Sequence, residues 1–408
     1  MRIPQGFAAP GDTRVCRLNK SLYGLRQASR NWYHKFTQAL GELQFRPSPA
    51  DHSLFIYERG STHLVSLIYV DDVLLAGNDM EFISRVKKFL HQHFSIKDLG
   101  NLRYFLGIEV TRSPHDIVLS QQKYTLDILS DVGITACRPS AFPVEQNHHL
   151  TRPSSDALVG ASSYRRLVGR LLYLTVMRPD IAYNVNVLSH FVQAPRQLHL
   201  DAVHRILHYL KSSPGQGLFF PANRSLDLVA YCDADWGGCE STRRFTTGFF
   251  ISLGGAPVSW RSKKQHVVAR SSAKVEYRAM ASKVSEVIWL RWLLSERGVP
   301  QPAATPLHCD NQAALHIAAN PVFHERTKHV EIYSYFVREC VQSGHIVPLK
   351  VISHLQLADL FTKGLGADRF CFPLSKLSAS FPSQLAREYW VVITRPRPSP
   401  PHVSMQAM

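Results

Sequence analysis

Apolar and polar positions alternate with two different periods along the first hundred residues, which predicts both strands and helices. Two β-prone runs, 64–70 and 73–75, flank Asp71 and Asp72, so the pattern predicts a hairpin with two carboxylates at its tip. Residues 81–93 repeat apolar positions with the helical period. A mixed α/β fold is therefore expected from this part of the chain onward.

The middle of the chain is expected to be largely helical. One strand is predicted at 103–110, and helical periodicity then runs from about 120 to 212. A loop-like segment near 138–163 interrupts it, and Gly215 and Gly217 end it.

Strands and helices alternate again after residue 223, which predicts a second α/β domain at 223–365. Its longest amphipathic pattern, 272–296, is ended by Gly298 and Pro300. Strands are expected at 226–232, 247–253, 258–260, 307–309 and 346–352, and further helices at 327–342 and 356–363.

Composition narrows the class of protein. The 408 residues include 47 Lys and Arg against 31 Asp and Glu, a formal net charge of +16. A hydrophobic fraction of 45% excludes a wholly disordered chain. The positive charge favours an anionic partner such as nucleic acid, although a merely solubilising surface explains the charge equally well.

Neither a membrane protein nor a disulfide-stabilised protein fits the sequence. The apolar runs are far shorter than the roughly 20 residues that a spanning helix needs, and the first residues contain no apolar signal-peptide core. The 7 cysteines include no Cys-x-x-Cys pair, which argues against a disulfide framework and a structural zinc site. We expect no membrane partner and a reducing, intracellular location, cytoplasmic or nuclear.

The adjacent carboxylates of Asp71 and Asp72 form the first candidate site. Two acids between apolar runs are costly unless a cation lies against them, and Mg²⁺ prefers such hard oxygen ligands. Aspartate is also common in solvated turns, and for two aspartates alone that simpler interpretation is favoured.

Four acids in the second domain form the other candidate site. Glu276 aligns at helical spacing with Met280, Val284 and Val287, an apolar face on which a carboxylate is costly unless it binds a cation. A turn or the helix dipole explains any one such acid, but four together point to a shared metal site. The other three acids are Asp233, Asp310 and Asp359.

Seven segments carry a family resemblance: 18–33, 69–72, 96–100, 104–110, 164–169, 178–182 and 209–211. In this order they resemble the reverse transcriptase of copia-type LTR retrotransposons. The resemblance implies that Asp71 and Asp72 are palm carboxylates that bind Mg²⁺, and that Tyr69 and Gln27 contact the nucleotide. It also implies a partial palm and fingers at 1–115, a helical thumb or connection at 116–222, and RNA template and DNA as partners.

The chain departs from this family at the third polymerase carboxylate. The family places that acid on a strand before a Pro-Gln-Gly-Phe element, which here stands at residues 4–7. The only early acid, Asp12, lies in a turn instead. Because two-metal phosphoryl transfer needs both ions clamped, we expect the polymerase to be incomplete and inactive.

A second set of segments resembles the ribonuclease H of the same elements: 231–236, 271–279, 309–311, 320–329 and 357–363. The resemblance implies an α/β ribonuclease H-like domain with Asp233 on the first strand, Glu276 on a helix, Asp310 after the fourth strand and Asp359 on the final helix. It implies two Mg²⁺ ions at this site and cleavage of the RNA in an RNA–DNA hybrid. Asp235 is the alternative to Asp233 for the first-strand position. We favour Asp233, because Asp235 is followed by Trp236 and is expected to be part of a turn.

Basic residues near this site are expected to contact hybrid phosphates, unless they lie in solvated turns. His329 and His354 are possible substrate contacts, and for each an ordinary surface histidine is the simpler interpretation. The four basic residues are Arg243, Arg244, Lys263 and Lys264.

Some positions depart from the ribonuclease H pattern. Lys274 stands where the family usually has Glu, and 332–336 lacks the usual Asp and His. Residues 366–408 are expected to be a disordered or unrelated tail. Two functions therefore remain open: a Mg²⁺-dependent ribonuclease H attached to a truncated polymerase, or a decayed nucleic-acid-binding remnant. An integrase-like strand transferase is disfavoured, because the chain lacks a zinc-binding His/Cys module.

Overall fold

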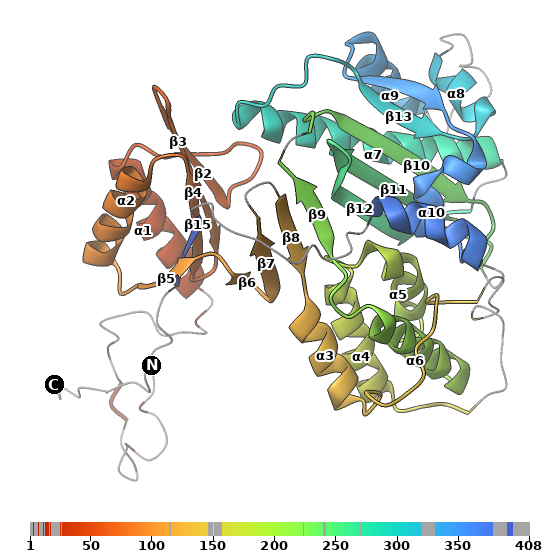
Figure 1. The fold of residues 1–408 in the computed structure, drawn as a ribbon, viewed down its shortest axis with the longest axis horizontal. Coiled ribbons are helices and arrows are strands. Elements are labelled where there is room, and N and C mark those ends of the chain that lie inside the picture. Colours follow the sequence, from red (N-terminus) through yellow and green to blue (C-terminus); the bar gives the residue numbers. More distant parts are fainter. Residues whose placement is uncertain are drawn as a thin grey trace. The chain divides into compact units, whose positions relative to one another are not determined.

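The computed structural model describes residues 27–113, 116–145, 150, 157–222, 224–239, 242–268, 271–319, 331–377 and 390–394, and eight further positions before residue 27. It divides into two compact units (Figure 1). One comprises Met1–Leu102 together with Tyr389–Met408, and the other comprises Arg103–Glu388. The chain is a mixed α/β protein, as the sequence predicts.

The first unit is a six-stranded sheet packed against two helices. Its core joins apolar side chains of the helices, such as Phe36 and Ile83, to Leu64 and Leu75 of the sheet. The predicted hairpin and the helix after it are both present. The sheet order is β1-β2-β3-β4-β15-β5, and the elements are α1 (Ala28–Glu42), β1 (Arg46–Pro47), β2 (Leu54–Arg59), β3 (Thr62–Tyr69), β4 (Asp72–Gly77), α2 (Met80–His93), β5 (Lys97–Asn101) and β15 (Trp390–Thr394).

Strand β15 comes from the segment expected to be disordered or unrelated, and the structure differs from that expectation here. It lies between β4 and β5 and is antiparallel to both. Thr394 pairs with Asp72, at the start of β4. The physical reason is local: residues 390–394 are aromatic, β-branched and therefore strand-prone, whereas the expectation of disorder came from the proline-rich residues that follow.

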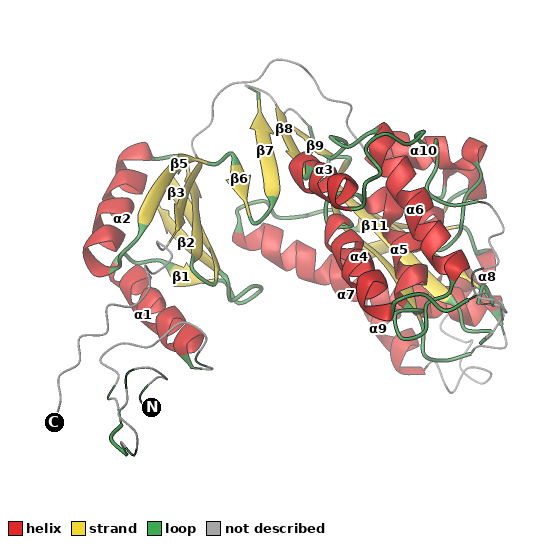
Figure 2. Cartoon of the chain, turned by 90° about the horizontal axis from the view of Figure 1, so that it is seen from below, coloured by secondary structure: helices red, strands yellow, loops and turns green. Residues whose placement is uncertain are grey.

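The second unit contains a four-stranded sheet and a group of helices (Figure 2). The strand predicted at 103–110 is two short strands, because Leu106 and Gly107 both have positive φ and form a turn. The boundary expected at 115/116 falls inside a hairpin, since Arg112 pairs with Ile117. The sheet order is β6-β7-β8-β9, and the elements are β6 (Tyr104–Phe105), β7 (Ile108–Arg112), β8 (Asp116–Ser120), α3 (Gln122–Asp131), α4 (Ala161–Leu174), η1 (Pro179–Ile181), α5 (Ala182–Ser189), α6 (Gln197–Ser212) and β9 (Leu218–Pro221).

A buried ion pair holds this helical group together. Arg178 and Asp180 are both about 1% exposed, and Arg178 Nη2 lies 2.7 Å from Asp180 Oδ2. The Tyr209 hydroxyl donates to the same carboxylate at 2.6 Å. The guanidinium also donates to the Ser213 carbonyl at 2.9 Å. Because nearly every polar atom of this pair has a partner, its burial between α4 and α6 is tolerated.

A five-stranded mixed sheet forms the rest of the second unit. Its first three strands are antiparallel, and β13 and β14 are parallel to their neighbours. The order is β12-β11-β10-β13-β14, and the elements are β10 (Leu228–Asp235), β11 (Thr246–Leu253), β12 (Ala256–Lys264), α7 (Ser272–Glu296), β13 (Thr305–Cys309), α8 (Gln312–Ala319), α9 (Glu331–Gln342), β14 (Ile346–Lys350), η3 (Ser353–Leu355), η4 (Leu357–Phe361) and α10 (Ala367–Leu377).

Helices cover both faces of this sheet. On one face Ala230 and Cys232 pack against Met280 and Val284 of α7, and α8 and α9 belong to the same cluster. On the other face Phe250 packs with the 3₁₀ helix η4 and the helices of 161–212. Helix 356–363 was predicted, and the described element is the shorter η4.

Helix α10 is a second regular element within the expected tail. Its Phe370 is buried and lies edge-on to Tyr209, with ring centroids 5.8 Å apart. Residues 367–377 therefore belong to the packed unit. No helix among the residues that the structure describes is long and apolar enough to span a membrane.

Candidate metal centre

The sheet register brings two of the predicted acids to the same level. Strands β10 and β13 are parallel neighbours, with Ala230 opposite Leu307. Asp233 and Asp310 lie three residues beyond these partners, at the carboxyl ends of the two strands. Glu276 reaches the same point from the second turn of α7, which packs on β10.

Three of the four predicted acids form one tight group. Ligand oxygens of Asp233, Glu276 and Asp310 all lie within 4.8 Å of one another, and within the described residues this is the one such group of His, Cys, Asp or Glu. Asp233 and Glu276 are buried, whereas Asp310 is partly exposed. The Ser353 hydroxyl donates to Asp310 Oδ2 at 2.9 Å and orients it.

Of the three carboxylates, the charged form of Glu276 is the one that its surroundings disfavour most. Its Oε1 accepts a hydrogen bond from the Ala234 N–H at 3.2 Å, while its buried Oε2 has no hydrogen-bond partner. Burial raises the pKa of Glu276 to about 10, and Asp233, Cys309 and Asp310 act in the same direction. A buried carboxylate with a free oxygen among other acids requires a cation to be stable in its ionised form.

Asp359 lies beside the group without being a member of it. It sits in η4 and is about 1% exposed. Lys363 Nζ donates to its Oδ1 at 2.8 Å, and Arg369 donates to its Oδ2. Burial, with Asp233, raises the pKa of Asp359 to about 6, although Lys363 and Arg369 oppose the shift.

Asp233 and its rival Asp235 have different surroundings. Asp233 accepts from the Thr362 hydroxyl, and Lys363 Nζ lies 3.3 Å from its Oδ2. Asp235 is directed to the loop after β10, where a Cβ on Gly238 would lie 1.6 Å from its Oδ2. Burial raises the pKa of Asp235, and Asp233 adds to the effect while Lys363 opposes it. Asp235 does not belong to the group of three.

The donor set fits magnesium. Three carboxylates supply hard oxygen ligands, which suit Mg²⁺ and leave coordination positions for water and phosphate oxygens. The partnerless Oε2 of Glu276 is the atom in this structure that a cation would satisfy. Asp233, Glu276 and Asp310 would hold such an ion.

The predicted phosphate contacts lie at the same end of the sheet. Lys263 pairs with Thr247, which in turn pairs with Ala234 beside Asp233. Lys264 donates to Cys239 Sγ at 2.9 Å and is partly buried. Arg243 and Arg244 are exposed in the loop between β10 and β11.

Three cationic residues of this domain, two of them in contact with the acids, were not assigned roles from the sequence. Lys363 stands four residues after Asp359, a spacing that could have signalled the pair. No role was predicted for Arg369, because it lies in the segment 366–408 that was expected to be a tail. Lys283, on α7, is about 5% exposed and lies 4.4 Å from the centre of the Phe249 ring.

The hairpin acids of the first unit form a separate candidate site. Asp71 lies in the turn and Asp72 begins β4, and both are partly exposed. Burial, with Asp71, raises the pKa of Asp72. Val70 has φ 54°, a strained conformation for a β-branched residue. Among the described residues no third acid, His or Cys joins the two in a metal-sized group.

For the other residues predicted from the sequence, the structure shows only where they lie and how exposed they are. Tyr69 is exposed beside this turn, and Gln27 is exposed at the start of α1. His354 is exposed in η3. Asp12 and the whole 320–329 motif, which includes His329, lie outside the described residues.

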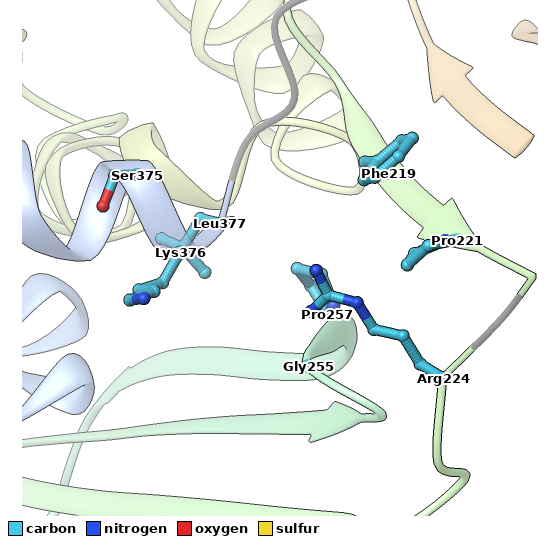
Figure 3. Close-up of a pocket in the computed structure, with 8 residues that line it drawn as sticks. All are labelled: Phe219, Pro221, Arg224, Gly255, Pro257, Ser375, Lys376 and Leu377. Atoms are coloured by element: carbon cyan, nitrogen blue, oxygen red, sulfur yellow. The ribbon is translucent and has the colours of Figure 1, made fainter. Parts of the chain in front are cut away.

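A cavity of about 170 Å³ lies at the other end of the β10–β11–β12 sheet (Figure 3). It adjoins the hairpin tip at Gly255, whereas Asp233 and Asp235 are near the opposite ends of the same strands. It contains no acid and is distinct from the metal centre. Its lining residues are Phe219, Pro221, Arg224, Gly255, Pro257, Ser375, Lys376 and Leu377.

Comparisons with known proteins agree with the motif analysis. Residues 1–146 match the family model described as reverse transcriptase (RNA-dependent DNA polymerase). The retrovirus-related Pol polyprotein from transposon RE1 of Arabidopsis thaliana is 42% identical over 93% of this chain, which spans 26% of that polyprotein. A putative transposon Ty5-1 protein of Saccharomyces cerevisiae is 33% identical over 70% of this chain and 94% of its own length.

The similarity to solved structures is weaker. A foamy viral protease-reverse transcriptase in complex with RNA/DNA hybrid has a TM-score of 0.45 and 10% identity, covering 81% of this chain and 39% of that one.

Proposed function

Because this chain belongs to the Pol polyproteins of copia-type LTR retrotransposons, we propose that its second unit contains a Mg²⁺-dependent ribonuclease H that cleaves the RNA of RNA–DNA hybrids. The chain spans about a quarter of the RE1 polyprotein. The observation that carries the proposal is the partnerless buried oxygen of Glu276 between Asp233 and Asp310.

Each acid has a distinct role in this proposal. Asp233, Glu276 and Asp310 would hold one Mg²⁺ ion, and Asp359 with Asp233 would hold a second. Bound Mg²⁺ supplies an activated water and stabilises the leaving 3′-oxygen. The chain itself orients the carboxylates: the Ala234 N–H fixes Glu276, and the Ser353 hydroxyl fixes Asp310.

Substrate contacts come from basic residues at the same sheet end. Arg243, Arg244, Lys263 and Lys264 bind hybrid phosphates, which positions the strand but does not read its sequence. The 2′-hydroxyl distinguishes the RNA strand from the DNA strand.

The first unit contributes the reverse-transcriptase part of the proposal. Asp71 and Asp72 act there as palm carboxylates, with Tyr69 and Gln27 at the nucleotide. Two carboxylates from one turn do not clamp two ions, so the polymerase is incomplete in this chain.

A labelled RNA–DNA hybrid tests the ribonuclease. The full chain is expected to cleave the RNA strand with Mg²⁺, and Asp310→Asn is expected to lower cleavage by about a hundredfold or more, because one ligand of the ion is lost. Binding of the hybrid should persist in Asp310→Asn.

Asp127→Asn is the matched control, because Asp127 is exposed on α3 in the same unit. Binding without cleavage by the unaltered chain would contradict the proposal and favour a decayed nucleic-acid-binding remnant.

A further inference from the structure

One cation of this chain lies where two acids of the proposed centre face each other. Lys363 follows η4 by two residues, and its Nζ is 2.8 Å from Asp359 Oδ1 and 3.3 Å from Asp233 Oδ2. The two carboxylates, 126 residues apart in sequence, thus share a single ammonium group. Asp233 belongs at the same time to the group with Glu276 and Asp310.

The other oxygen of Asp359 is also occupied. Arg369 Nη2 donates to Asp359 Oδ2, and the same nitrogen donates to the Ser353 carbonyl at 3.0 Å. Asp359 therefore has a cationic partner on each oxygen, whereas Glu276 keeps one oxygen without a hydrogen-bond partner. The four acids divide into a group of three that is open to an ion and a fourth acid that is already neutralised.

We propose that Lys363 is an exchangeable counter-ion, which occupies the place between Asp233 and Asp359 that a second divalent cation must take. The inference rests on the proposed function, since it presumes that these acids bind metal. An ammonium group and a divalent ion cannot both lie within contact distance of the same two oxygens, because like charges repel strongly there. The first ion then binds independently of Lys363, and the second binds only as Lys363 leaves.

Of the two basic side chains that contact Asp359, Lys363 can exchange with a metal ion more easily than Arg369. The Lys363 side chain is about 34% exposed, so its ammonium group can swing into water without crossing the core. Lysine is a compact, well hydrated charge on a flexible stem. Arg369 is anchored by the Ser353 carbonyl as well as by Asp359, and so it can hold Asp359 in place while Lys363 moves.

Mn²⁺ binding, measured by electron paramagnetic resonance on the full chain, tests the exchange. Lys363→Met is expected to tighten the second, weaker Mn²⁺ site at least tenfold and to leave the first site unchanged. Lys123→Met, at an exposed position on α3 of the same unit, is the matched control, and it should not tighten either site. A second site no tighter in Lys363→Met than in the unaltered chain would overturn the inference.

A measurement without substitution guards against a variant that does not fold. The rate of Lys363 acetylation, followed by mass spectrometry on the unaltered chain, should rise severalfold when Mn²⁺ fills both sites. Lys350, which donates to Gln312 Oε1 at 2.9 Å, is the internal control and should not change. An unchanged Lys363 rate at saturating Mn²⁺ would contradict the exchange.

The two proposals fail in different ways. If the unaltered chain binds no Mn²⁺, or if Asp310→Asn leaves both sites intact, the metal centre itself is wrong and the exchange falls with it. If the first site is lost in Asp310→Asn while Lys363→Met changes nothing, only the exchange is wrong.

Discussion

At the scale of single residues, Lys283 shows how far tertiary burial changes the chemistry of a side chain. It lies on α7, packed over the Phe249 ring. Burial lowers the pKa of Lys283 to about 8. Cys232 and Glu286 act in the opposite direction, and Arg261 and Lys263 add to the lowering. The charged form is therefore destabilised in the folded state.

Replacement of Lys283 by Met is expected to stabilise the protein at pH 7 by about 3 kcal/mol, on the order of 1.4 kcal/mol per pKa unit. Below pH 8 the lysine is charged in both the folded and unfolded states, and only the folded state bears the burial cost. Between about pH 8 and 10.5 the folded lysine loses its proton, the unaltered protein gains stability, and the difference should shrink.

Urea unfolding of both proteins from pH 6 to 10.5 measures this difference. Lys123→Met, at an exposed position on α3, is the control and should change little. A stability difference that does not vary with pH over this range would show that folding does not lower the pKa of Lys283.

At the scale of elements, β15 determines how the first sheet is closed. Its backbone pairs with β4 on one side and β5 on the other, so neither strand has an unpaired edge at this position. Unpaired strand edges exchange their amide hydrogens readily and invite non-native pairing. The strand also lies directly beside Asp72 of the hairpin.

Proline at both Val391 and Val392 is expected to detach β15, because the N–H groups of successive strand residues point to opposite neighbours and one donor is therefore lost from each ladder. Hydrogen exchange in β4 and β5 should become at least about tenfold faster as their ladders are lost. Mass spectrometry of peptides from both strands measures the change.

Threonine at the same two positions keeps the β-branched character and serves as the control. Unchanged protection of β5 in the proline variant would show that β15 does not pair there in solution.

At the scale of the whole molecule, the two candidate centres differ in completeness. The second unit gathers three carboxylates within 4.8 Å and a fourth beside them. The hairpin of the first unit contributes Asp71 and Asp72, with no third ligand among the described residues. The positive net charge of +16 belongs to the chain as a whole and does not distinguish the two centres.

The full chain is therefore expected to show no primer extension on an RNA template with Mg²⁺ and nucleotides, because the polymerase ions are not clamped. Cleavage of a labelled hybrid by the same preparation would show that the second unit is folded, and hydrogen exchange in β3 and β4 reports on the first unit. Processive synthesis that is lost in Asp72→Asn would refute this expectation, whereas synthesis that persists in that variant comes from a contaminant.

Local patterns determined much of this protein from sequence alone. The hairpin at Asp71–Asp72, the helix 272–296 and the order of the later strands follow from hydrophobic periodicity, which acts over a few residues. The candidate acids were also evident, because a carboxylate within an apolar pattern stands out wherever the chain later folds. Their roles as metal ligands stay predictions.

Only the tertiary structure decided what surrounds those acids. Lys363 reaches Asp233 from 130 residues away. Lys283 is buried over Phe249, and β15 joins β4 from more than 300 residues away along the chain. Such contacts depend on how distant segments pack, and no local period encodes them. Burial and the nearest charge, which set the pKa of a carboxylate or an amine, arise only when those segments meet.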